Sequence, residues 1–210
     1  RTLEDLDAIR AAAVNARRGV VVGGGLLGFV VALGTSYGPR WSRLAVSLYV
    51  KLIQGTPLLV LLPLAYFGLP SLGLNVPPLG AAALALSIYV SAYLGEIWRG
   101  CIESVPRTQA EAAECLALRW HQRVIHVILP QAVKIATPPT VGFMVQIVKN
   151  TSLASAIGFV ELARAGQIIN NSTFEPFVIF VIVAMLYFAL CYPLSVLSRR
   201  LERSFHVAHR

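Results

Sequence analysis

Residues 176 to 198 read PFVIFVIVAMLYFALCYPLSVLS, a run of 23 residues that contains no charged side chain. A helix needs about 20 mostly apolar residues to cross a lipid bilayer, and this run is long enough. Charged residues do not recur at every third or fourth position, as they would in an amphipathic helix of a soluble protein. The run is therefore predicted to be a transmembrane helix.

Four other segments are also mostly apolar and long enough to cross a bilayer. One contains no charge, and the other three contain a single charged residue each, namely Lys51, Glu96 and Lys149. A stretch rich in Pro and Gly, residues 68–78, separates the second segment from the third. The sequence thus predicts an all-α membrane protein with five transmembrane helices, at about 19–36, 44–66, 79–98, 135–158 and 176–198.

The overall composition agrees with a membrane protein. The 210 residues are 56% hydrophobic and only 13% charged, whereas soluble domains have about 25% charged residues. So much apolar surface also excludes a disordered chain. The net charge of +8 is not interpreted as nucleic-acid binding, because the charges avoid the apolar segments. The three cysteines have no metal-ligand spacing, so no metal site is expected.

Lysine and arginine are unevenly distributed between the two sides of the predicted membrane domain. If the C-terminus is cytoplasmic, 11 of the 18 basic residues lie in three cytoplasmic segments, including a basic tail at 199–210. The positive-inside rule then predicts an N-terminus outside and a C-terminus in the cytoplasm. The basic residues in 1–18 oppose this orientation. They indicate either an amphipathic helix on the membrane surface or a further span upstream.

The longest segment between two predicted spans is 99–134. Thr108 and Glu111 have the spacing of a capping box, which predicts a helix that has Thr108 as its N-cap and runs through Leu118. A second group of apolar residues at helical spacing, from Val124 to Leu129, leads to Pro130, where a helix is expected to break. Two short helices along the cytoplasmic face are therefore predicted. From this pattern alone, a hairpin that merely links two spans is an equal alternative.

The residues EAAECLALRWHQRVIHVILPQA, from Glu111 to Ala132, resemble the EAA loop of ATP-binding-cassette (ABC) importer permeases. Positions matching the family pattern are Glu111, Ala112, Ala113, Ile128, Leu129 and Pro130, whereas Ala117 stands where the family has Gly. Four further segments resemble the polar amino-acid uptake branch, the histidine/glutamine/arginine permease type. They are QGTPLLV (54–60), YLGEIWRGCIESVP (93–106), VKNTSLASAIG (148–158) and SRRLER (198–203).

The resemblance covers roughly residues 44–205 and implies a type I ABC importer transmembrane subunit in a bacterial inner membrane. Such a subunit moves a polar or charged amino acid by alternating access and is not itself an enzyme. Implied partners are a cytoplasmic ABC ATPase dimer that holds ATP and Mg²⁺, a second permease subunit and an extracytoplasmic amino-acid-binding protein. The resemblance leaves open which amino acid is moved and whether the second permease is identical or homologous.

The same resemblance implies that the loop contains a coupling helix that docks on the ATPase. Leu116, Leu118 and Trp120 are candidates for anchoring contacts, and Arg119 and Arg123 for pairs with acidic groups. At Ala117, either the turn avoids a positive φ or a small strain is tolerated. The full set of expected coupling residues is Glu111, Ala112, Ala113, Glu114, Leu116, Ala117, Leu118, Arg119 and Trp120.

Charges inside a membrane usually face protein or a water-filled cavity. The substrate implied by the resemblance carries an ammonium and a carboxylate group, so polar residues in the spans are candidates for its path. The hypothesis places Gln54, Gly55 and Thr56 opposite the segment 149–152, with Arg164 at the outer mouth. An internal ion pair or hydrogen-bond network is the alternative. The expected path residues are Gln54, Thr56, Glu96, Lys149, Asn150, Thr151, Ser152 and Glu161.

Two other classes of protein are considered. A secondary carrier or channel that needs no ATPase is the main alternative, although such proteins usually have internal repeats. A membrane-embedded enzyme finds no support in metal or nucleophile motifs. Finally, the pairs Gly19/Gly23, Gly24/Gly28 and Gly34/Gly38 predict close packing of the first span on a neighbouring helix.

Overall fold

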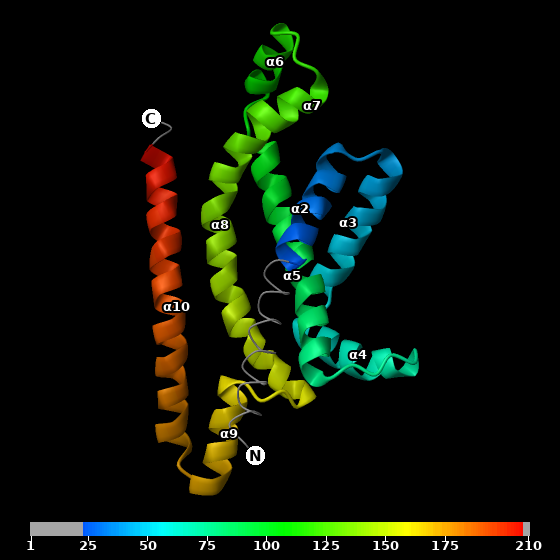
Figure 1. Ribbon diagram of the computed structural model, residues 1–210. Helices are drawn as coiled ribbons and strands as arrows, with labels where there is room; N and C mark the ends of the chain where they lie inside the picture. Colours follow the sequence, from blue (N-terminus) through cyan, green and yellow to red (C-terminus); the bar gives the residue numbers. More distant parts are fainter. Residues whose placement is uncertain (1–22, 208–210) are drawn as a thin grey trace, which may run out of the picture.

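The computed structural model describes residues 23 to 207, and in this part of the chain all regular elements are helical (Figure 1). The predicted segment 1–18 lies outside the described residues. The elements are α2 (Gly24–Tyr37), α3 (Arg40–Gly55), α4 (Leu58–Ser71), α5 (Pro78–Glu103), α6 (Arg107–Cys115), α7 (Trp120–Arg123), the π-turn η2 (Val124–Ile128), α8 (Leu129–Asn150), the 3₁₀ helix η3 (Thr151–Ile157), α9 (Leu162–Thr173) and α10 (Pro176–Val207).

Helix α5 is the centre of the fold, with α2, α3, α4 and α8 packed around it (Figure 1). Small residues bring α2 and α5 close together. A Cβ added to Gly28 would lie 2.9 Å from Leu94 Cβ, and one added to Gly24 would lie 2.8 Å from Val90 Cγ1. The predicted role of the Gly24/Gly28 pair in close helix packing is confirmed.

The predicted span at 44–66 is bent in the structure, and such a bent pair of helices can still be one span. The structure has two helices there, α3 and α4, whose axes differ by 103°. The break falls at Thr56 and Pro57, where Thr56 is extended (φ −105°, ψ 124°). A residue before proline is pushed out of the helical region, and Pro57 has no N–H to donate to the preceding turn. Helix α4 therefore runs across the direction of α5 instead of continuing α3 (Figure 1).

The predicted helix break at Pro130 is wrong. The chain stays helical from α7 through η2 into α8, and Leu129 N–H donates to Val124 O across the wider π-turn. In a regular α-helix, the ring of Pro130 would clash with the carbonyl group four residues earlier. The wider π-turn directly before Pro130 relieves this clash. The predicted span 135–158 is instead α8 up to Asn150 followed by η3, and α9 then departs at 52°.

Two described helices, α5 and α10, are long and apolar enough to cross a membrane as single helices, and the number rises to four if each bent pair is one span. The five predicted crossings remain a prediction, since α2 has 14 described residues. Helix α10 lies beside α8 and α9, and its C-terminal end is at the same end of the molecule as α6 and α7 (Figure 1).

Candidate functional site

The segment α6–α7 projects beyond the other helices at one end of the molecule (Figure 1). Its first helix begins two residues earlier than the capping box predicts. Pro106 is the N-cap, Arg107 is the first helical residue, and no side chain caps the helix. The predicted capping box of Thr108 and Glu111 is therefore wrong, because Thr108 is already inside the first turn.

A tight turn ends α6 at Cys115, three residues before the predicted end. Ala117 adopts the left-handed conformation with φ +56°. Around it, Leu118 N–H donates to Ala113 O at 3.2 Å and Ala117 N–H donates to Glu114 O at 2.8 Å, which is a Schellman motif. Left-handed Ala costs about 1 kcal/mol relative to Gly. Of the two alternatives for this position, the structure shows the tolerated strain.

The turn exposes apolar side chains to solvent. Leu116 is 76% exposed and Trp120 is 54% exposed. The ring of Trp120 also meets the edge of Tyr37 in α2, with ring centroids 5.3 Å apart. Leu116 and Trp120 thus form a small exposed apolar surface, and the contact of Trp120 with Tyr37 holds this surface against α2.

The candidate basic residues of the segment differ in their partners. Arg123 Nη1 donates to Glu114 Oε2 at 2.5 Å, so this arginine ties α7 to α6 inside the chain. Arg119 is exposed, and its backbone N–H donates to Gln122 Oε1 at 2.9 Å. The guanidinium of Arg119 is thus directed to the surface, whereas that of Arg123 has an internal partner.

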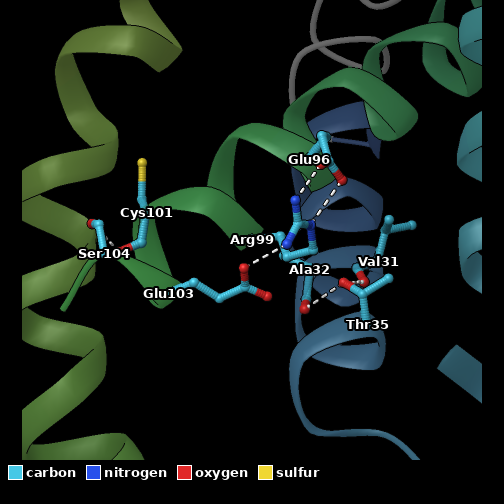
Figure 2. A network of polar contacts seen from close by, with 8 residues as sticks. All are labelled: Val31, Ala32, Thr35, Glu96, Arg99, Cys101, Glu103 and Ser104. Carbon is cyan, nitrogen blue, oxygen red and sulfur yellow. Dashed lines mark hydrogen bonds and ion pairs between the residues drawn. The ribbon is translucent and has the colours of Figure 1, made fainter. Parts of the chain in front are cut away.

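A second group of polar residues forms a ladder on the last turns of α5 (Figure 2). Arg99 Nε donates to Glu96 Oε2 at 2.9 Å, and the same guanidinium makes a second contact with the other oxygen of Glu96. Arg99 Nη1 reaches Glu103 Oε2 at 2.5 Å. All three residues belong to one helix, so these ion pairs do not tie helices together. Sequence reasoning missed Arg99 and Glu103, although their i, i+3, i+7 spacing is the signal for such a ladder.

The ladder forms one wall of a cleft between α2, α3 and α5, with a volume of about 440 Å³. Gln54 lies in this cleft. Its helix ends at Gly55, while η3 packs mainly against α4. The lining residues are Thr35, Arg43, Ser47, Val50, Lys51, Gln54, Glu96, Arg99 and Glu103.

The segment 149–152 lies at the junction of α8 and η3. Lys149 is exposed, and Asn150 accepts a hydrogen bond from Gln146 Nε2 at 3.3 Å. Thr151 and Ser152 donate their hydroxyls to the carbonyls of Val148 and Lys149, both at 2.7 Å. These two hydroxyls are thereby used within the helix turn.

Glu161 has a local structural role. Its carboxylate accepts the backbone N–H groups of Ala163 at 2.8 Å and Arg164 at 2.7 Å, which caps α9. Tyr187 of α10 donates its hydroxyl to the same carboxylate at 2.8 Å. Glu161 thus links the start of α9 to α10.

An aromatic stack beside this region escaped the sequence-based reasoning. Tyr89 and Tyr93 of α5 have ring centroids 4.5 Å apart, and Tyr93 stacks on Phe143 of α8 at 5.6 Å. Asn150 lies beside Tyr89. The i, i+4 spacing of the two tyrosines places them on one face of α5, but the partner on α8 follows only from helix packing.

Comparison with known proteins identifies relatives across most of the chain. The family described as "Binding-protein-dependent transport system inner membrane component" matches residues 24–207. The probable glutamine ABC transporter permease protein GlnM of Bacillus subtilis is 37% identical over 75% of this chain and 74% of its own length. The L-cystine transport system permease protein TcyB of the same organism is 36% identical, over 86% and 79%.

Solved structures give the same result for the fold. One described as an amino acid ABC transporter with histidines has a TM-score of 0.84 and 32% identity, and the match covers 97% of this chain and 99% of that one. An inward-facing structure of the MetNI methionine ABC transporter has a TM-score of 0.71 at 18% identity, covering 98% and 99%. This second likeness supports the fold alone.

Proposed function

The chain belongs to the family of binding-protein-dependent transport system inner membrane components, as a permease of an amino-acid ABC transporter, and we propose that its α6–α7 segment couples transport to a separate ATPase. The architecture is that of a type I ABC importer permease. The family implies an ATPase and an extracytoplasmic binding protein as partners. The observation that carries the coupling proposal is the projecting turn at Ala117, which presents Leu116.

The geometry of this turn suits docking in a groove. Leu116 is exposed at the tip and Trp120 is half exposed beside it, so the turn presents apolar surface of the kind that marks an interaction site, with a Trp as the residue type that commonly anchors one. Arg119 faces outward beside it and supplies a charge for acidic groups at the rim. The ring of Trp120 contacts that of Tyr37, so a displacement of the α6–α7 segment is transmitted directly to α2. Glu111, Ala112 and Glu114 provide the exposed face of α6 next to this tip.

The substrate is proposed to be a polar amino acid, with L-glutamine as the first compound to test, because relatives are named as glutamine permeases. Hydrolysis of ATP with Mg²⁺ is assigned to the partner ATPase and not to this chain. A second permease subunit, identical or homologous, is proposed to complete the pore. The loop and the C-terminal tail are proposed to face the cytoplasm, with the N-terminus outside.

Reconstitution tests this function. The chain is co-purified with its ATPase and incorporated into liposomes with the binding protein, and uptake of radiolabelled L-glutamine, L-arginine, L-histidine and L-cystine is measured. Uptake of one of them that requires ATP is the expected result. Uptake by the chain without ATPase or ATP would support a secondary carrier instead.

Coupling is tested separately with Leu116→Ala. Removal of this exposed tip is expected to lower the ATPase activity stimulated by the loaded binding protein at least fivefold, with thermal stability unchanged. The control is Leu186→Ala, which removes an exposed Leu side chain in the half of α10 that follows α9. Equal stimulated activity in Leu116→Ala and wild type would refute the coupling role of the tip.

A further inference from the structure

Helix α3 presents three different faces. One packs against the fold, where Val50 is buried and the Tyr49 hydroxyl donates to Ile88 O of α5 at 3.0 Å. A second face is apolar and yet exposed. Its side chains follow one another at intervals of three or four residues, which places them on one side of the helix, and their exposed fractions run from 57% to 76%. They are Trp41, Leu44, Leu48 and Leu52.

The third face is positively charged. Arg40 and Arg43 are both exposed, and neither has an ion-pair partner among residues 23–207. Arg43 also lines the cleft between α2, α3 and α5, but the carboxylates of that cleft already bind Arg99. Arg40 lies about one turn before Leu44, so the charged face borders the exposed apolar face directly. Helix α3 therefore carries two guanidinium groups, which no carboxylate of the described chain neutralises, beside an unpacked apolar stripe.

The two arginines lie at a boundary of the apolar part of the molecule. Helix α2 contains no charged residue, and Arg40 is the first charge after it. Because the ring of Tyr37 contacts Trp120 of α7, the connection between α2 and α3 lies at the end of the helix bundle nearest the α6–α7 segment (Figure 1). Trp is enriched where a membrane meets water, and arginines next to apolar surface extend their charges toward the headgroups. The start of α3 is thus suited to a membrane surface.

We propose that the start of α3 is a binding site for an anionic phospholipid, with the lipid phosphate on Arg40 and Arg43 and an acyl chain along Trp41, Leu44 and Leu48. Basic residues next to a membrane attract anionic headgroups, and guanidinium groups form charge-assisted hydrogen bonds with phosphate. Lys51 lies about 12 Å further along the helix than Arg43, at 1.5 Å per residue, so one headgroup reaches the two arginines and not this lysine. Such a lipid is a partner of the chain in addition to the transported amino acid and the other subunits.

A protein subunit with acidic residues is the competing occupant of this surface. Helices that pack closely inside a membrane have small residues at their interface, as α2 and α5 do at Gly24 and Gly28. The exposed stripe of α3 instead consists of Trp and Leu side chains. Large apolar side chains that continue from a pair of arginines fit a lipid better than a second helix.

The experiment uses the complex of the chain with its ATPase in phosphatidylcholine nanodiscs. Brominated phosphatidylglycerol or brominated phosphatidylcholine is included at the same mole fraction, and quenching of tryptophan fluorescence is measured. The difference between wild type and Trp41→Phe isolates the quenching of Trp41, which reports lipid at the site. The same difference is measured in Arg40→Gln/Arg43→Gln and in Arg200→Gln/Arg203→Gln, a control that removes two exposed arginines of the same spacing from the end of α10. Size-exclusion profiles and thermal stability verify that each variant is folded.

In wild type, Trp41 is expected to prefer phosphatidylglycerol over phosphatidylcholine about threefold or more, because each of the two arginines attracts the anionic headgroup. This preference is expected to disappear in Arg40→Gln/Arg43→Gln and to persist in Arg200→Gln/Arg203→Gln. Retention of the hydrophobic contact is also expected, so brominated phosphatidylcholine still quenches Trp41 in every folded variant.

Three results would overturn the lipid site. An unchanged preference in folded Arg40→Gln/Arg43→Gln would show that the arginines do not hold the headgroup. Equal loss of preference in both double variants would indicate a diffuse attraction by the whole basic surface. Failure of both brominated lipids to quench Trp41 would show that protein covers this face. None of these measurements depends on uptake, so each result leaves the proposed transport function as it stands.

Discussion

Helices α5 and α10 both satisfy the length and hydropathy of a membrane span, yet they have opposite environments. Half of the most apolar window of α5 is buried inside the chain, against 11% for α10. Helix α5 is rich in Ala and Gly and is packed on by four other helices, whereas α10 carries large apolar side chains that point away from the fold. Hydropathy thus identifies a span, and residue size indicates which span can be surrounded by protein.

The largest effect is expected at the α2–α5 contact. Gly28→Leu would place a side chain where even a Cβ lies 2.9 Å from Leu94 Cβ and 3.3 Å from the backbone of Ser91. The helices must separate, so a loss of about 3 kcal/mol or more is expected. Thermal unfolding in detergent, followed by size-exclusion fluorescence, measures it.

The matched control lies three residues away on the same helix. A Cβ on Gly25 would meet nothing within 4 Å, so Gly25→Leu is expected to change stability by less than about 0.5 kcal/mol. Equal destabilisation by the two variants would show that α5 is not held by close contact with α2.

A smaller loss is expected from the charged ladder of α5. Arg99→Met leaves Glu96 and Glu103 without their partner, and the expected cost is about 1 kcal/mol, because the three side chains are partly exposed and solvent screens their charges. Replacing Glu96 and Glu103 by Gln together with Arg99→Met is expected to recover most of it. If the triple variant were no more stable than the single one, the cost would not come from unpaired charge.

The polar contact of α10 provides the next test. Tyr187→Phe removes the hydroxyl that donates to Glu161, and a loss of about 1 kcal/mol is expected. Tyr192→Phe, on an exposed part of the same helix, is the control and is expected to be neutral. A neutral Tyr187→Phe would mean that apolar contacts alone hold α10 against α9.

The smallest effect is expected on the outer face of α10. Met185 is 66% exposed, so Met185→Ala is expected to change the thermal stability of the single chain by less than about 0.5 kcal/mol. A clear loss of stability measured in the assembled transporter, but not in the single chain, would indicate that a second subunit covers this face. A large loss in the single chain would contradict the contrast between α5 and α10.

The candidate site was only partly predictable from the sequence. The position of the coupling loop, and the presence of Ala117 where the family has Gly, can be read from residues 111–130, because the EAA motif is local in the sequence. The capping box failed because the N-cap is Pro106, two residues before Thr108. Glu96 was singled out as a charge in an apolar run, but its setting, a cleft completed by Arg43 and Lys51, depends on the packing of α3 against α5.

By itself, the sequence determined that this protein is helical, that it belongs in a membrane, and that residues 79–98 and 176–198 lie in helices long and apolar enough to span one, because these properties depend on apolar run length and local motifs. Pro57 marks the place of the break in 44–66, but the tertiary structure alone decided its angle of 103°, that Pro130 is tolerated after a π-turn, and which apolar helix is buried. The physical reason is that bends and packing depend on the helices that come together in space, and a hydropathy pattern carries no record of those neighbours.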